Sequence, residues 1–218
     1  MTPDEQAIIY CIQNQDSSEL ASLLAANPGL ADTRTDAGVS ALMLALYTGQ
    51  RHLARSIAAH RMGLDIFEAS ALGVRAVIER SLEMDPDAVM HISADGMSPL
   101  HFAARFNQPD ICGLLLDRGA NPDFVSENPL AFTPLHAAVA GASLESTELI
   151  LDAGASVDRR QGDGLTALMA AAGTGQIEMV ALLLDHGADS DARSEQGLRA
   201  AELAIDQGFD EVADILGA

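Results

Sequence analysis

The chain has 218 residues, 48% of them hydrophobic, and its 32 acidic and 12 basic residues give a formal net charge of −20. All twelve basic residues are arginine, which excludes enzymes that depend on a phosphate-binding or Schiff-base lysine. So acidic a protein repels phosphate backbones, and we expect no nucleic-acid binding. The acids serve either solubility or the steering of a partner, and the composition leaves both open.

The sequence predicts neither export nor membrane insertion. Its longest apolar runs are too short to cross a bilayer, and its first residues carry acid where a secretory signal carries base. We therefore expect a cytoplasmic protein without membrane association. Cys11 and Cys112 lie far apart in the chain and are expected to be buried free thiols.

The predicted elements begin with a helix opened by Thr2-Pro3-Asp4-Glu5, which is typical of a capping box. A second helix follows through the leucines at 20, 23 and 24. Ser40-Ala41-Leu42-Met43 and Asp65-Ile66-Phe67-Glu68 open two further helix pairs. Ile66 follows Leu42 by only 24 residues, which predicts that the loop joining these two pairs is largely missing.

The second half of the chain repeats one block three times. The copies are Ser98-Pro99-Leu100-His101, Thr133-Pro134-Leu135-His136 and Thr166-Ala167-Leu168-Met169, and their leucines are 35 and 33 residues apart. The hydroxyl residue can cap a helix, and proline at the first helical position loses no hydrogen bond. Arg199-Ala200-Ala201-Glu202 continues the period towards the end of the chain. A period near 33 residues is typical of a repeat solenoid.

The pattern resembles the ankyrin repeat over nearly the whole chain. The resemblance implies an all-α solenoid of about seven helix-turn-helix units with short finger loops, in a single domain, residues 1–218. The predicted units are residues 2–35, 36–62, 63–92, 93–127, 128–160, 161–193 and 194–218. The resemblance also implies a non-catalytic module that binds a partner protein through its concave groove and finger tips. We expect no metal or cofactor, a monomer, and a partner with a basic surface.

Three fragments resemble chemical sites. Gly162–Ala167 has the glycine spacing of a dinucleotide fingerprint, but no strand precedes it, which favours a turn over a phosphate cradle. His101 and His136 lack a second ligand at metal-binding spacing, which favours hydrogen bonding to the backbone. Asp189 and Asp191 resemble the start of a calcium loop without its glycine and closing glutamate, so we expect ordinary loop residues.

The candidate binding surface follows from the resemblance, which places it one residue before the motif Ser or Thr, or before the divergent Arg199 in the last unit, and seven or eight residues after the Ser or Thr. The partner-binding residues predicted in this way are Val39, Tyr47, Met97, Arg105, Phe106, Phe132, Leu165 and Leu198. Three of the eight aromatic residues of the chain lie among them, which favours a binding patch over side chains folded inward as a satellite core. Arg105 would pair with a carboxylate of the partner or with a neighbouring acid.

Two irregularities leave parts of this surface open. The missing loop between the second and third units leaves undecided whether Tyr47 and Phe106 share one groove. The connection from Gly119 to Thr133 is two residues longer than the regular one, and it is either a binding insertion or a surface bulge. The alternative function is a regulatory or enzyme-associated subunit that holds a peptide or small ligand, and a true enzyme ranks third.

Overall fold

The computed structural model describes residues 1–217, and Ala218, the last residue of the seventh predicted unit, lies outside the described residues. The described part contains fourteen α-helices and two 3-10 helices, and its one β-type contact is an isolated bridge between Arg34 and Ser40. The α-helices are α1 (Pro3–Asn14), α2 (Ser17–Ala26), α3 (Ala41–Tyr47), α4 (Arg51–Ala59), α5 (Ile66–Leu72), α6 (Arg75–Met84), α7 (Pro99–Arg105), α8 (Pro109–Asp117), α9 (Pro134–Ala140), α10 (Leu144–Asp152), α11 (Ala167–Gly173), α12 (Ile177–Asp185), α13 (Ala200–Asp206) and α14 (Asp210–Ile215). The 3-10 helices are η1 (Pro28–Asp32) and η2 (Pro86–Met90).

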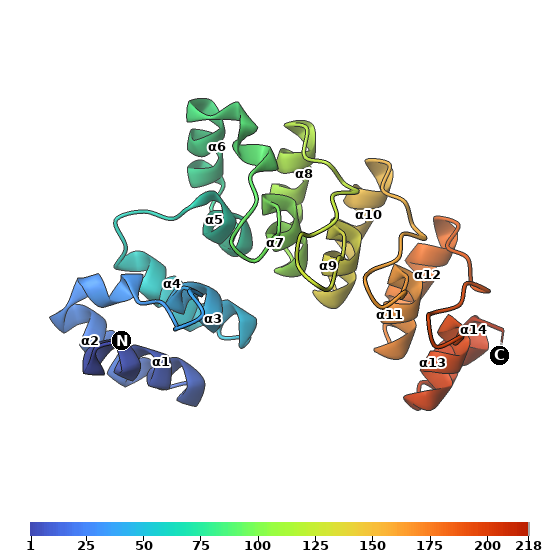
Figure 1. The fold of residues 1–218 in the computed structure, drawn as a ribbon, viewed down its shortest axis with the longest axis horizontal. Helices are drawn as coiled ribbons and strands as arrows, with labels where there is room; N and C mark the ends of the chain where they lie inside the picture. The colour runs from blue at the N-terminus through green and yellow to red at the C-terminus, as the bar shows by residue number, and fades with distance from the viewer. Residues whose placement is uncertain (218) are drawn as a thin grey trace.

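The α-helices form seven consecutive pairs stacked into a curved row, with the two termini at opposite ends (Figure 1). From α5 onward, the first helix of each pair packs against the first helix of the next pair. From α8 onward, the second helices form a parallel outer row. This arrangement confirms the predicted all-α solenoid, whereas the residue boundaries of the units stay a prediction.

The helices begin where the sequence predicts caps. The Thr2 hydroxyl accepts a hydrogen bond from Glu5 N–H at 3.3 Å, and the Glu5 carboxylate accepts one from Thr2 N–H at 2.6 Å. Asp65 and Glu68 form the same reciprocal pair at the start of α5. In α7 and α9, histidine replaces the glutamate of this pair. The caps satisfy N–H groups that have no partner within the helix, and so they fix where each helix starts.

The buried side chains form two cores. The larger core runs through α5 to α14 and contains the motif leucines Leu100, Leu135 and Leu168. The smaller core joins α1 to α4 and is completed by side chains of α5 and by Phe102 and Phe106 from α7 and its C-terminal end. The first four helices are therefore attached to the rest of the chain partly through two phenylalanines that lie far from them in the sequence.

The connection between α4 and α5 is shorter than the other connections between helix pairs in the described chain. It contains six residues, 60–65, whereas the connections before α3, α7, α11 and α13 contain fourteen each. The connection before α9 contains sixteen. We call the projecting part of each long connection a finger. Both predicted irregularities are confirmed, since the finger before α5 is missing and the finger before α9 is two residues longer. In Figure 1, helices α1 to α4 lie offset from the row that begins at α5.

Candidate functional site

Five of the eight predicted binding residues meet in one pocket of about 200 Å³. It lies where the end of α3 meets the end of α7 and the fingers before α7 and α9. We call it the junction pocket, and its lining residues are Tyr47, Met97, Phe102, Arg105, Phe106, Asn128, Leu130 and Phe132. The predicted residues among them are Tyr47, Met97, Arg105, Phe106 and Phe132.

The missing finger brings Tyr47 and Phe106 into contact. Their ring centroids are 5.7 Å apart with the planes inclined at 45°, a favourable geometry for an aromatic pair. The Tyr47 hydroxyl lies 3.4 Å from an oxygen of Asp95, to which it donates. Burial, with a further contribution from the Asp95 charge, raises the pKa of Tyr47. The hydroxyl therefore stays protonated and links α3 to the finger before α7.

The junction pocket has a buried floor and an exposed rim. The floor is Phe106, which is 8% exposed and belongs to the smaller core. At the rim, Tyr47 is 41% exposed and Leu130 is 61% exposed. The Arg105 guanidinium carbon lies 5.9 Å from the centre of the Phe106 ring, within reach of a cation–π contact. Arg105 forms no ion pair within the described residues, so its charge is available to a ligand.

The other three predicted residues lie outside the junction pocket. Val39 lines a second pocket beside the finger before α3. Leu165 packs on the larger core, and Leu198 is half-buried in the finger before α13. Sequence reasoning missed Leu130, a large part of the rim. It lies in the lengthened finger before α9, and the two extra residues of that finger were its only trace in the sequence.

His101 and His136 brace the fingers. Nε2 of His101 lies 3.1 Å from the Phe132 carbonyl oxygen, and Nε2 of His136 lies 3.2 Å from that of Leu165. A carbonyl only accepts, so Nε2 carries the proton in both rings. Burial lowers the pKa of His101 to about 4 and also lowers the pKa of His136, so both rings are neutral at pH 7. The predicted backbone role is confirmed, and the His101 bond holds Phe132 in the wall of the junction pocket.

The other chemical candidates are accounted for by local structure. The Asp189 N–H donates to a carboxylate oxygen of Asp158, and the Asp189 carboxylate in turn accepts from the N–H of Asp191, both at 2.9 Å. Residues 162–164 form a turn. Across residues 1–217, no three His, Cys, Asp or Glu side chains gather in an arrangement that could hold a metal ion. None of the described helices is both long and apolar enough to span a bilayer.

Both cysteines are free and buried, as the sequence predicts. Burial raises the pKa of Cys11 and raises that of Cys112 to about 12, so both thiols stay protonated at neutral pH.

Comparison with known proteins identifies the family. A family model described as "Ankyrin repeats (3 copies)" matches residues 66–161 and 135–217, which is more than half of the chain. The chain therefore belongs to the ankyrin repeat family, as its sequence motifs indicate. Ankyrin repeats are in general protein–protein interaction modules. Helices α1 to α4 precede the matched residues.

The curated relatives are mostly much longer than this chain. Neurogenic locus notch homolog protein 4 of Homo sapiens is 35% identical over 138 residues, which cover 63% of this chain and 6% of that protein. Glycerophosphocholine phosphodiesterase gde1 of Schizosaccharomyces pombe is 36% identical over 80 residues, or 35% of this chain and 7% of that protein. Putative ankyrin repeat protein L371 of Acanthamoeba polyphaga mimivirus is 30% identical over 99 residues, which cover 43% of this chain and 13% of that protein. The chain thus matches only a small part of each relative.

Proposed function

We propose that the chain is a non-catalytic module that binds a partner protein through the junction pocket and the finger tips beside it. The observation that carries this proposal is the exposed apolar rim of Tyr47 and Leu130 above the buried ring of Phe106. Binding energy at protein interfaces concentrates in apolar and aromatic side chains that seat in such enclosed pockets. The junction pocket offers that arrangement without any movement of the backbone.

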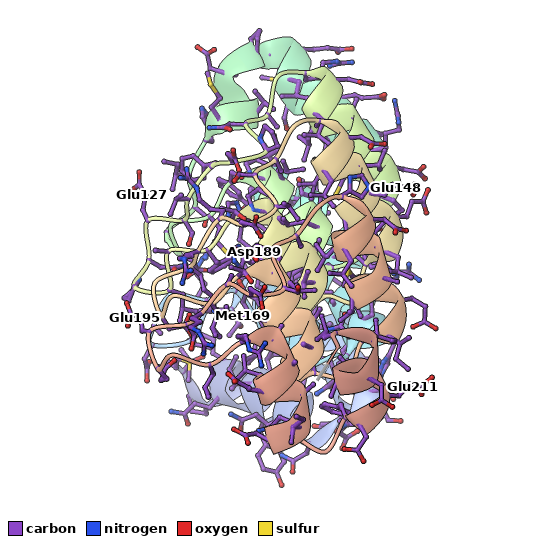
Figure 2. The ribbon with its side chains drawn as sticks, turned by 90° about the vertical axis from the view of Figure 1, so that its right-hand side faces the viewer. Glu127, Glu148, Met169, Asp189, Glu195 and Glu211 are labelled. Carbon is purple, nitrogen blue, oxygen red and sulfur yellow. The ribbon has the colours of Figure 1, made fainter. Side chains whose placement is uncertain are left out.

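The charge distribution favours a partner with a basic surface. Figure 2 shows Glu127 and Glu195 projecting from the loop side of the stack and Glu148 and Glu211 from the helix side. With a net charge of −20, the chain attracts a basic partner from a distance and so raises the association rate. Arg105 at the pocket would receive a single carboxylate of that partner. We also propose that the protein acts as a monomer in the cytoplasm, a compartment that suits its two free thiols.

The test compares three baits in affinity capture from the native cell, followed by measurement of binding with each purified partner. The baits are the parent chain, the double variant Tyr47→Ala with Leu130→Ala, and the control Leu144→Ala. Leu144 lies on α10, outside the junction pocket, and is 41% exposed, so its truncation removes a side chain of similar exposure. We expect a partner that binds the parent and the control equally and is lost with the double variant.

The expected loss is about 2 kcal/mol or more, or roughly thirtyfold in affinity, and should come from faster dissociation. Raising the salt from low to physiological concentration should slow association and leave dissociation nearly unchanged, because only exposed charges are screened. A directly bound partner with equal affinity for all three baits would overturn the assignment of the junction pocket.

A further inference from the structure

A second pocket occupies the place where the missing finger would lie. Its volume is about 260 Å³, and its walls are the finger before α3 and the finger before α7. Its floor includes Phe67 and Glu68 of α5 and Phe102 of α7. We call it the finger gap, and its lining residues are Arg34, Ala37, Gly38, Val39, Ser40, Met43, Asp65, Phe67, Glu68, Ile92, Ser93, Ala94, Asp95 and Phe102.

Where two fingers are neighbours, hydrogen bonds join them. The bonds run from backbone to backbone in two of the three neighbouring pairs, whereas the Arg160 side chain donates to the Arg193 carbonyl between the fingers before α11 and α13. Glu127 N–H donates to the Gly96 carbonyl at 2.8 Å, and Gly162 N–H donates to the Leu130 carbonyl at 2.7 Å. The position that corresponds to Glu127 in the finger before α7 is Ala94. Its N–H lies in the wall of the finger gap and has no hydrogen-bond partner among the described residues.

The opposite wall also lacks a backbone partner. The Gly38 carbonyl at the tip of the finger before α3 accepts a hydrogen bond only from the side chain of Arg34 in the same finger, at 2.8 Å. The two walls therefore present a backbone donor and a backbone acceptor of the kind that an intervening finger would engage.

One wall of the finger gap carries an apolar side chain. Ile92 is 40% exposed and lines the gap. The corresponding position holds an arginine in three other fingers, and each of these arginines donates to a glycine carbonyl of its own finger tip. On the floor, the rings of Phe67 and Phe102 lie 5.7 Å apart. The wall formed by the finger before α7 therefore offers an apolar contact, whereas the opposite wall carries Arg34.

The charges at the finger gap are mostly negative. Glu68 is already paired with Arg61 and bonded to the Ser40 hydroxyl. Asp65 and Asp95 are exposed at the edge of the gap, and Arg34 is the one cation in its lining. A ligand that brings a positive charge would be favoured over one that brings a negative charge.

We propose that the finger gap binds a turn-forming segment of a partner protein that carries an apolar side chain beside an arginine or lysine. The segment takes the place of the missing finger. Its backbone bonds to Ala94 N–H, its apolar side chain contacts Ile92 and Phe67, and its cation faces Asp65 and Asp95. The finger gap shares Phe102 with the junction pocket but neither of the rim residues Tyr47 and Leu130, so the inference can be tested independently of the proposed function.

The test selects peptides from a phage-displayed library of short random sequences on the full chain, and measures binding of the synthesised peptides by fluorescence anisotropy. The decisive variant is Ile92→Arg, which installs the residue that three other fingers carry and is expected to leave the fold intact. The matched control is Val125→Arg, at the corresponding position of the finger before α9, whose neighbouring fingers are both present. Circular dichroism verifies the fold of both variants.

We expect the selected peptides to share an apolar residue beside an arginine or lysine. Ile92→Arg should weaken their binding by about tenfold or more, which corresponds to about 1.4 kcal/mol, and Val125→Arg should leave it nearly unchanged. Backbone NMR shifts on peptide binding should fall on residues 34–40, 65–68 and 92–95. Failure to select any binding peptide, or binding that is insensitive to Ile92→Arg, would overturn the proposal. Neither result bears on the junction pocket, which is tested through Tyr47 and Leu130.

Discussion

Truncation of Phe106 is expected to loosen the first four helices while the larger core stays folded. The Phe106 side chain is 8% exposed, lies in the smaller core and pairs with the ring of Tyr47 at 5.7 Å. Removal of a buried phenyl ring costs about 3–5 kcal/mol, and the aromatic pair accounts for about 1 kcal/mol of this. Because Phe106 opens slightly into the junction pocket, we expect Phe106→Ala to cost about 3–4 kcal/mol. The cost should fall mainly on the attachment of α1 to α4.

Amide hydrogen exchange read by mass spectrometry measures this cost locally. In Phe106→Ala, residues 1–59 should lose protection by about two to three factors of ten, since each 1.4 kcal/mol is about tenfold. Helices α9 to α14 should keep their protection. The control is Leu135→Ala in the larger core, which should lower the protection of α7 to α14 instead. Equal loss of protection along the whole Phe106→Ala chain, or none in α1 to α4, would refute the view that Phe106 joins the two parts.

Three further outcomes are expected. Leu135 is 0% exposed, so Leu135→Ala should cost about 2–5 kcal/mol in a urea melt, and a change below about 0.5 kcal/mol would show that the assigned register is wrong. The pKa of His101 is lowered to about 4, so on acidification the unfolded state binds the proton before the folded state does. The free energy of unfolding should therefore fall by about 3 kcal/mol from pH 6.5 to pH 4. His101→Gln should flatten this dependence, and an equally steep fall in that variant would contradict the view that His101 is buried and neutral. Solution X-ray scattering should give a radius of gyration above about 17 Å, the value for a compact domain of this length, and the compact value would contradict the extended stack.

The helix starts could be predicted from the sequence because they depend on local chemistry. A hydroxyl or carboxylate side chain caps the N–H groups of the turn that follows it, whatever the rest of the chain does. Ser40, Asp65, Ser98 and Thr133 therefore mark the starts of α3, α5, α7 and α9 in the sequence as they do in the structure. The missing finger could also be predicted, because the number of residues between Leu42 and Ile66 limits the length of the connection between the two helix pairs.

The geometry of the candidate site could be predicted only in part. The binding residues are predicted from their distance in sequence from the motif Ser or Thr. This approach holds only where each helix pair stacks on the next in the same way, with a finger between them. Between α4 and α5 this condition fails, and the end of α3 reaches Phe106 at the end of α7. The aromatic character of the site follows from the sequence, whereas the burial of Phe106 depends on a tertiary contact. Leu130 lies in an irregular finger that has no counterpart in the repeat, so counting could not reach it.

The absence of one finger accounts for both pockets. In a solenoid each unit contacts mainly its neighbours, so the loss of a finger changes one layer and leaves the remaining caps and helices in place. At the helix ends, α3 meets α7 and the junction pocket forms between them. On the finger side, two walls remain without the segment that would join them. Phe102 lines both pockets, and the bond from Tyr47 to Asp95 runs from the lining of one to the lining of the other. The two proposed sites therefore lie on either side of Phe102 and the Tyr47–Asp95 bond. Each site can be altered through its own exposed residue, Leu130 in the junction pocket and Ile92 in the finger gap.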